Sequence, residues 1–160
     1  MEPNILLVME TDQWWDRELS EMTTPFAARR QHIPEDEGDF GMHLFSNIEL
    51  VSPEFKFCFG AYTPTIVIGF RLPNGEAFQF IGMHPRPPIP PSQSTMFRDA
   101  HLLTAALEAR ASELPAVIAG DLNSVPWDDV TARMLRLGEL LDPRLGRGLW
   151  TTCCTRSNSA

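Results

Sequence analysis

The stretch "PAVIAGDLNSVPWDD", from Pro115 to Asp129, decides which fold this sequence predicts. Its apolar run, Ala116 to Ala119, is too short for a helix core and is typical of a buried strand. Gly120 ends the run, and Asp121 and Asn123 follow with one residue between them. Ligand sites in layered α/β proteins gather where loops leave the ends of such strands. The stretch therefore predicts a strand that delivers a carboxylate and an amide at its end.

The composition is that of an ordinary globular domain. The 160 residues, 43% of them hydrophobic and 21% charged, are enough for one domain with a core. The net charge of −8 argues against nucleic-acid binding by charge alone, but a metal-dependent phosphate site remains compatible with it. No apolar run approaches the ~18 residues of a membrane helix. The three cysteines, two of them adjacent, indicate neither a disulfide framework nor a structural zinc site.

Strand and helix patterns are mixed along the chain. Apolar runs predict strands over residues 4–10, 41–47, 56–62, 64–72, 77–84 and 116–119. Helical spacing predicts helices over residues 11–22, 94–114 and 128–138. An Asn-Gly pair within residues 73–76 is typical of a hairpin turn, and the prolines of residues 84–91 indicate an extended loop. Residues 151–160 show no clear pattern, and the mixture as a whole predicts an α/β or α+β class with a mixed sheet.

Polar side chains follow three of the predicted strands. Glu10 ends the first, His84 ends the strand after the hairpin turn, and Asp121 and Asn123 follow the run already described. If these ends meet, two carboxylates, one imidazole and one amide share a site whose hard oxygen ligands suit Mg²⁺ or Mn²⁺. Each residue also has a simpler interpretation. Glu10 and His84 are then solvated surface residues, and Asp121 and Asn123 cap the next turn.

The order of these motifs resembles that of the endonuclease/exonuclease/phosphatase superfamily, which includes DNase I, AP endonucleases, sphingomyelinases and inositol polyphosphate 5-phosphatases. "GDLN" (residues 120–123) resembles the family's Gly-Asp-(Phe or Leu)-Asn motif. "NILLVMETD" (4–12) resembles its early strand, and "FIGMHPRPP" (80–88) the strand that ends in its catalytic histidine. "GMHLFSNIEL" (41–50) resembles another family segment, from which Asn47 and Glu49 depart. The His-Pro-x-Pro-Pro form is typical of a bacterial subgroup.

The resemblance implies a DNase I-like four-layer sandwich, with two mixed β-sheets packed face to face and helices outside. It also implies Mg²⁺-dependent (or Mn²⁺-dependent) hydrolysis of a phosphoric ester. Glu10 would bind the metal, His84 would contact the scissile phosphate, Asp121 would activate or orient water, and Asn123 would stabilise a phosphoryl oxygen. The substrate, whether nucleic acid, nucleotide, lipid or inositol phosphate, stays open.

Three further residues are weaker candidates for the site. Trp127 is expected to pack beneath it rather than to serve as a substrate platform. Arg98 and Asp99 fall where the bacterial subgroup often has a polar pair that opens the long helix, and they are expected to lie away from the substrate.

The family pattern has two more parts for which this sequence shows no counterpart. They are an N-terminal strand that ends in a metal-site asparagine and C-terminal strands that carry an Asp-His pair. We therefore expect residues 1–160 to be a single domain truncated at both ends and inactive alone. The alternative is a degenerate, non-catalytic homologue that serves as a metal-binding, phosphate-binding or interaction module. Relatives in the subgroup often follow membrane helices, so a membrane-tethered or extracytoplasmic location stays open, as does the oligomeric state.

Overall fold

The computed structural model describes residues 3–22, 26–35, 40–57, 63–88, 95–142 and 153–156. Its elements in chain order are β1 (Ile5–Thr11), α1 (Gln13–Met22), β2 (Ala28–His32), β3 (Gly41–Ser46), β4 (Glu49–Lys56), β5 (Thr65–Arg71), β6 (Ala77–Met83), α2 (Thr95–Ala111), β7 (Ala116–Ala119), α3 (Asp129–Gly138) and β8 (Cys153–Arg156). Within these ranges, no helix is long and apolar enough to cross a membrane.

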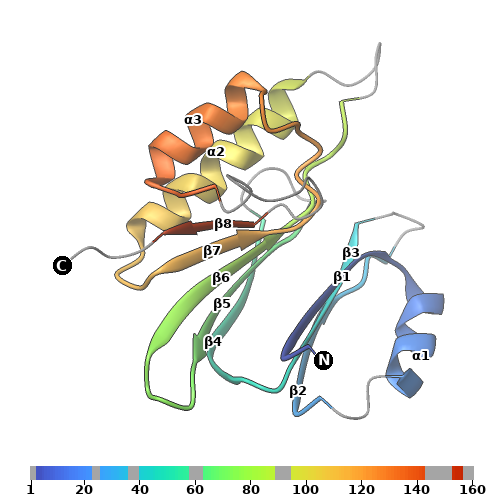
Figure 1. The fold of residues 1–160 in the computed structure, drawn as a ribbon. Coiled ribbons are helices and arrows are strands. Elements are labelled where there is room, and N and C mark those ends of the chain that lie inside the picture. Colours follow the sequence, from blue (N-terminus) through green and yellow to red (C-terminus); the bar gives the residue numbers. More distant parts are fainter. Residues whose placement is uncertain are drawn as a thin grey trace.

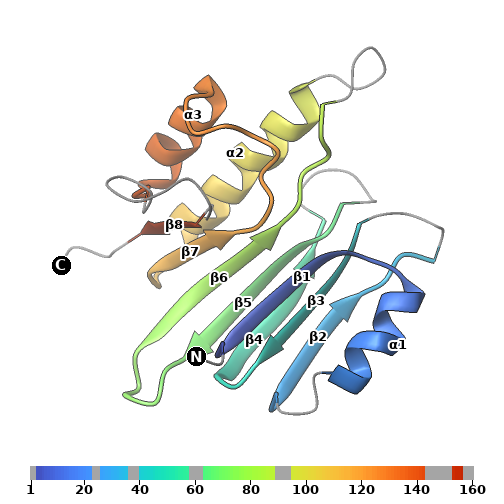
Figure 2. The same cartoon turned by 45° about the vertical axis from the view of Figure 1, so that its right-hand side comes forward.

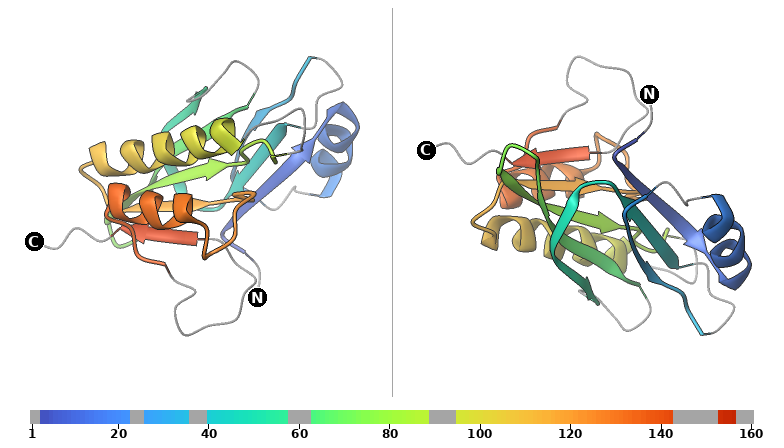
Figure 3. Two further views of the ribbon diagram at one scale, coloured as in Figure 1. Left: turned by 90° about the horizontal axis from the view of Figure 1, so that it is seen from above. Right: turned by 90° about the horizontal axis from the view of Figure 1, so that it is seen from below.

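The strands form two sheets that pack face to face (Figure 1). Sheet A has three antiparallel strands in the order β1-β3-β2. Sheet B has five strands in the order β4-β5-β6-β7-β8, and it is mixed because β6 and β7 run parallel. Helix α1 lies on the outer side of sheet A, and α2 and α3 lie side by side on the outer side of sheet B (Figures 1 and 3). The predicted four-layer sandwich is confirmed.

Alternation of side chains along each strand builds two separate cores. Between the sheets, Met42 and Leu44 of β3 pack with Ile66, Ile68 and other apolar residues of sheet B. Under the helices, alternate residues of β6 and β7 pack against α2 and α3. Small residues of α2 allow its close approach to the sheet. The buried members of this second core are Ile81, Met83, Leu102, Ala105, Ala106, Ala109, Ala116, Ile118, Leu122, Val130, Met134 and Leu140.

Aspartates cap the N-terminal ends of two of the helices. The side chain of Asp12 accepts hydrogen bonds from the backbone N–H groups of Trp14 and Trp15 at 2.9 Å each. The side chain of Asp128 accepts one from Val130 at the start of α3. Such caps satisfy N–H groups that have no partner within the helix, and each typically contributes about 1 kcal/mol.

The prediction of a strand over residues 56–62 is not met at Phe57, which lies in no strand, and it stays untested over residues 58–62. Strand β4 occupies Glu49–Lys56 instead, so only Lys56 is common to both, and residues 58–62 lie outside the described part of the chain. A register shift between Leu50 and Ser52 breaks the alternation, and Pro53 lies within the strand. Proline is tolerated here because β4 is an edge strand, which pairs with β5 alone.

Strand β8 lies in the tail for which the sequence shows no pattern. It pairs antiparallel with β7, from Ala119 opposite Cys153 to Ala116 opposite Arg156. Four residues are too few to show a strand period, so the partner strand, rather than local sequence, defines this element.

Candidate functional site

Glu10 and His84 meet although they belong to different sheets. Glu10 Oε1 lies 3.4 Å from His84 Nε2. Glu10 comes from β1 of sheet A, and His84 directly follows β6 of sheet B. The Glu10 side chain is 64% exposed, whereas the His84 side chain is only 5% exposed. The packing of the two sheets therefore pairs an accessible carboxylate with a buried imidazole at the edge of the sandwich.

A β-bulge turns Glu10 toward sheet B. The pairing of β1 with β3 shifts register between Met9 and Thr11, and Glu10 between them has a φ of 58°. This left-handed conformation costs a residue with a side chain ~1 kcal/mol or more. Bulges re-aim a side chain and are common next to functional sites. The strained conformation of Glu10 therefore occurs at the residue that leaves the regular pairing of β1 with β3.

His84 is fixed by its surroundings but retains an unused ring nitrogen. The ring of Phe40 lies 5.7 Å from the His84 ring, and the Arg86 guanidinium lies 4.8 Å from the centre of Phe40. The Nδ1 atom of His84 is buried and has no hydrogen-bond partner among the described residues. A buried polar atom without a partner costs ~1–3 kcal/mol, and Arg29 Nε and Gln79 Oε1 are two others among the described residues.

Gly120 lets the loop after β7 cross the end of β6. Its φ is 146°, and a Cβ atom at this position would overlap the carbonyl oxygen of Met83. The segments that follow β6 and β7 run side by side (Figure 2). The side chain of Asn123 donates a hydrogen bond of 2.8 Å to the carbonyl oxygen of Pro85. The loop with Asp121 and Asn123 is thereby joined to the segment that begins with His84.

The simpler interpretation, in which Asp121 and Asn123 cap the turn after the strand, also holds in part. The backbone N–H of Asn123 donates a 2.9 Å hydrogen bond to Asp121 Oδ1, which closes a turn within the loop. Asn123 has a φ of 48°, a left-handed conformation that asparagine tolerates well. Asp121 remains exposed to solvent. These two side chains therefore hold the loop, and the second carboxylate oxygen of Asp121 and one amide hydrogen of Asn123 are not used in these bonds.

Arg98 anchors the same loop from α2. Its side chain is buried, and one guanidinium nitrogen donates a 3.1 Å hydrogen bond to the carbonyl oxygen of Asn123. A second nitrogen forms ion pairs with Asp99 at 2.7 Å and with Asp128 at 2.9 Å. The polar pair at the start of the long helix was the only sequence signal for this role. Arg98 therefore joins the first turn of α2, the loop after β7 and the cap of α3.

Trp127 does not pack beneath the site, so that expectation is wrong. The residue is 77% exposed. The backbone N–H of Asp128 donates a 3.0 Å hydrogen bond to Val125, which closes a turn with Trp127 near its apex. Val125, and Met96 and Phe97 at the start of α2, are exposed as well. The loop that carries Asn123 thus presents apolar side chains to solvent.

A further buried histidine joins α2 to sheet B. His101 of α2 is almost fully buried, and its Nε2 lies 2.6 Å from Thr65 Oγ1 of β5. Burial lowers the pKa of His101 to about 4, and the charge of His84 acts in the same direction. His101 is therefore neutral near pH 7.

Glu10 is the predicted metal ligand, and the donor chemistry around it can be compared with what Mg²⁺ requires. No group of three or more His, Cys, Asp or Glu side chains among the described residues could together hold a metal ion. Mg²⁺ nevertheless keeps several waters and binds through one or two carboxylates, and Mn²⁺ favours similar oxygen ligands. The exposed carboxylate of Glu10 fits this requirement.

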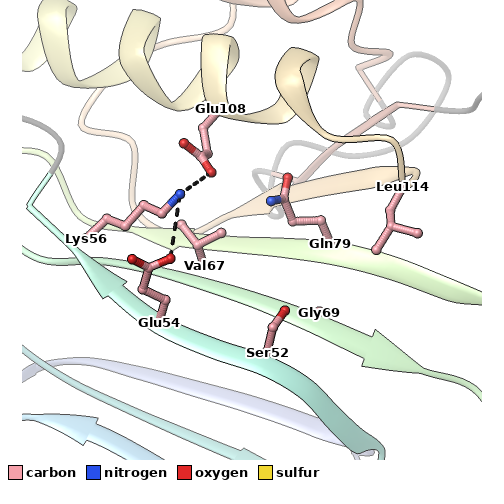
Figure 4. Close-up of a pocket in the computed structure, with 8 residues that line it drawn as sticks. All are labelled: Ser52, Glu54, Lys56, Val67, Gly69, Gln79, Glu108 and Leu114. Atoms are coloured by element: carbon pink, nitrogen blue, oxygen red, sulfur yellow. Dashed lines mark hydrogen bonds and ion pairs between the residues drawn. The ribbon is translucent and has the colours of Figure 1, made fainter.

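A separate pocket of about 320 Å³ lies between α2 and the outer face of sheet B (Figure 4). Lys56 crosses it, 2.5 Å from Glu108 and 3.7 Å from Glu54. The rest of its lining is Ser52, Val67, Gly69, Gln79 and Leu114. The pocket contains none of the four residues predicted for the site, so it is distinct from the place where Glu10 meets His84.

Comparisons with known proteins agree with this fold. The human Nocturnin catalytic domain, with bound sulfate, is 15% identical and superposes with a TM-score of 0.76 over 96% of this chain and 69% of its own. Sphingomyelinase C from Streptomyces griseocarneus is 15% identical, with a TM-score of 0.74 over 100% of this chain and 73% of its own. A Bacteroides thetaiotaomicron endonuclease/exonuclease/phosphatase family protein is 14% identical, with a TM-score of 0.73 over 95% and 68%.

A search of curated proteins gave no match. The profile of the Endonuclease/Exonuclease/phosphatase family, in contrast, matches residues 2–160. This match covers nearly the whole chain and includes every residue predicted for the site. The protein therefore belongs to the endonuclease/exonuclease/phosphatase family.

Proposed function

We propose that this protein is a Mg²⁺- or Mn²⁺-dependent phosphoric ester hydrolase whose site forms where Glu10 meets His84. The family and fold are those of hydrolases that act on ester bonds. The observation that carries the proposal is the 3.4 Å approach of Glu10 Oε1 to His84 Nε2 across two sheets. An exposed carboxylate and a buried imidazole at one edge provide a metal ligand and a fixed polar group for a phosphate.

In this proposal each residue has one role. Glu10 holds the cation, which when bound supplies positive charge against the phosphoryl group. His84 contacts the scissile phosphate, since its ring is fixed by burial and by Phe40. Asp121, which is exposed, orients the attacking water. Asn123 donates its remaining amide hydrogen to a phosphoryl oxygen.

Two of the similar structures support the choice of ligands. The Nocturnin structure contains a sulfate anion, which has the charge and shape of a phosphate group. A structure of a beta toxin variant from Staphylococcus aureus, 11% identical with a TM-score of 0.71, contains magnesium ions. Both ligands belong to those proteins, and they support a phosphate ester and a divalent cation as the ligands proposed for this one.

A metal- or phosphate-binding module without catalysis is the second candidate function. The observation that favours it is that both side chains already have structural partners: Asp121 bonds the backbone of its own loop, and Asn123 bonds Pro85 in the segment after β6. Side chains that hold a loop are less free to act on water or on a phosphoryl oxygen. Both candidate functions require the carboxylate of Glu10 to bind the cation. Only the hydrolase would turn over a substrate.

Hydrolysis of bis(p-nitrophenyl) phosphate in the presence of millimolar Mg²⁺ or Mn²⁺ tests the proposal. In the protein as it is encoded in full, we expect metal-dependent turnover that falls by 100-fold or more, on the order of 3 kcal/mol, in Glu10→Gln. Glu18→Gln, at an exposed position of α1, is the matched control and should keep full activity. Cation binding that depends on Glu10 without turnover would favour the second candidate. Absence of both would overturn the proposed function.

A further inference from the structure

The backbone at Glu10 is held by close pairing on both sides of the bulge. Met9 pairs with Met42, and Thr11 pairs with Gly41 at the start of β3. A Cβ atom at position 41 would overlap the carbonyl oxygen of Thr11, so the two strands approach more closely here than a side chain would allow. The bulge is therefore compressed between two fixed pairs.

A chain of buried polar contacts begins at the residue after Glu10. Thr11 is only 1% exposed, and its Oγ1 lies 2.9 Å from Nδ1 of His43, which is fully buried in β3. The Nε2 of His43 lies 3.0 Å from Asp16 Oδ1 of α1. Asp16 also pairs with Arg29 of β2. The contacts thus join all three strands of sheet A and the helix that covers them.

The directions of these hydrogen bonds follow from the chemistry of the groups. The Asp16 carboxylate can only accept, so Nε2 of His43 carries a hydrogen and donates it. Burial lowers the pKa of His43, which keeps its ring neutral, although the hydrogen bond with Asp16 opposes this effect. In the neutral ring Nδ1 accepts, and the hydroxyl of Thr11 is its donor. Every polar atom between Thr11 and Asp16 therefore has a defined partner.

Burying these polar groups costs free energy at a position that apolar side chains could fill equally well. Buried polar groups stabilise a fold only when every member has its partner, and they specify one arrangement of the chain. A left-handed residue such as Glu10 persists only when the surrounding structure determines its conformation. The network contacts the chain at the residue next to this strained position. Its location therefore matches a role in fixing the bulge.

We propose that Thr11 and His43 are positioning residues that hold the bulge at Glu10 and thereby direct its carboxylate toward the metal position. This inference rests on the proposed function, in which Glu10 binds the cation. Thr11 and His43 act through the backbone of the bulge and touch no substrate. Outer-shell groups of this kind typically change metal affinity by about 10-fold to 100-fold.

Thr11→Val and Thr11→Ser form a matched pair that tests the proposal. Valine keeps the shape of threonine without its hydroxyl, whereas serine keeps the hydroxyl. In the full chain, Mn²⁺ affinity measured by electron paramagnetic resonance should fall about 10-fold in Thr11→Val and stay within about two-fold of wild type in Thr11→Ser. Equal affinity of wild type and Thr11→Val would overturn the proposal.

Ser46→Ala is the control for general destabilisation of β3. Ser46 is also fully buried in this strand, and its hydroxyl bonds the backbone of Ile48 at 2.8 and 2.9 Å, at the end of β3 away from His43. Ser46→Ala should lower the melting temperature as Thr11→Val does but leave Mn²⁺ affinity unchanged. An equal loss of affinity in Ser46→Ala would refute a specific positioning role.

The backbone of residue 10 provides a readout that needs no metal. In wild type the ¹³Cα and ¹³Cβ chemical shifts of Glu10 should report a left-handed residue, and in Thr11→Val they should move toward strand values. Unchanged shifts in Thr11→Val would overturn the positioning role. If Glu10→Gln binds Mn²⁺ as wild type does, the proposed function fails instead, and these shifts still decide whether Thr11 and His43 hold the bulge.

Discussion

Gly120 and Met83 approach so closely that a Cβ atom at position 120 would overlap the carbonyl oxygen of Met83. The approach occurs where the loop after β7 passes the end of β6. It places the carboxylate and the amide of that loop beside the segment that carries the histidine. The conformation of one glycine thus connects a fold requirement to the geometry of the site.

Gly120→Ala should destabilise the protein by ~3 kcal/mol, because the added methyl group meets backbone rather than a side chain that can move. Gly75→Ala is the control, since its φ is also positive at 89° but nothing lies within 4 Å of the added atom. Its cost should be about 1 kcal/mol, from conformation alone. Urea denaturation measures both, and equal losses in the two variants would contradict the close approach.

Arg98→Met should cost ~3 kcal/mol, because it leaves the carboxylates of Asp99 and Asp128 without a buried partner and releases the carbonyl oxygen of Asn123. Arg110→Met, which loses a pair with Glu139 at 3.6 Å on the surface of the same helix, should cost no more than ~1 kcal/mol. Thermal unfolding followed by circular dichroism distinguishes the two. A loss of less than 1 kcal/mol for Arg98→Met would show that the loop does not depend on it.

The neutral state of His101 predicts a pH dependence of stability. Because its folded pKa of about 4 lies below the unfolded value of 6.5, the unfolded chain binds more protons between these values. The free energy of unfolding should therefore fall as the pH falls from 7, and His101 should account for about 2 kcal/mol of the loss by pH 5. His32 and His43, whose pKa values burial also lowers, contribute in the same direction.

The contribution of His101 is isolated by comparing wild type with His101→Gln. Glutamine keeps a polar group near Thr65 but does not titrate. The difference between the two free energies of unfolding should change by about 2 kcal/mol between pH 7 and pH 5. A difference that is independent of pH would show that His101 is not buried in its neutral form.

Trp127→Ala should leave the free energy of unfolding within ~0.5 kcal/mol of wild type, because the side chain is exposed and removes little apolar area from water. Urea denaturation gives the value directly. A loss above ~2 kcal/mol would restore the expectation that Trp127 packs beneath the site.

The sequence predicts those parts of the fold that have a local pattern. The apolar run from Ala116 to Ala119, followed by Gly120, shows a strand pattern in the local sequence alone, and the structure confirms the strand. Strand β4 has no such pattern, since Pro53 and the register shift after Leu50 interrupt its alternation. Strand β8 is defined by its pairing with β7.

The candidate site likewise has features that local sequence predicts and features that only the tertiary structure shows. The family motifs predict Glu10, His84, Asp121 and Asn123 as residue types at strand ends, but only the packing of two sheets shows that Glu10 and His84 meet. Arg98 is separated from Asn123 by 25 positions, and no spacing rule relates them. Trp127 could not be placed, because its exposure depends on a turn that Val125 and Asp128 close.

The central claim is that Glu10 binds a divalent cation at the place where the two sheets meet. A crystal structure of the chain with Mn²⁺, with anomalous difference density collected for manganese, tests it most directly. The account predicts a manganese peak within coordination distance of the Glu10 carboxylate and on the side of His84. A peak elsewhere, or none at saturating Mn²⁺, would contradict it.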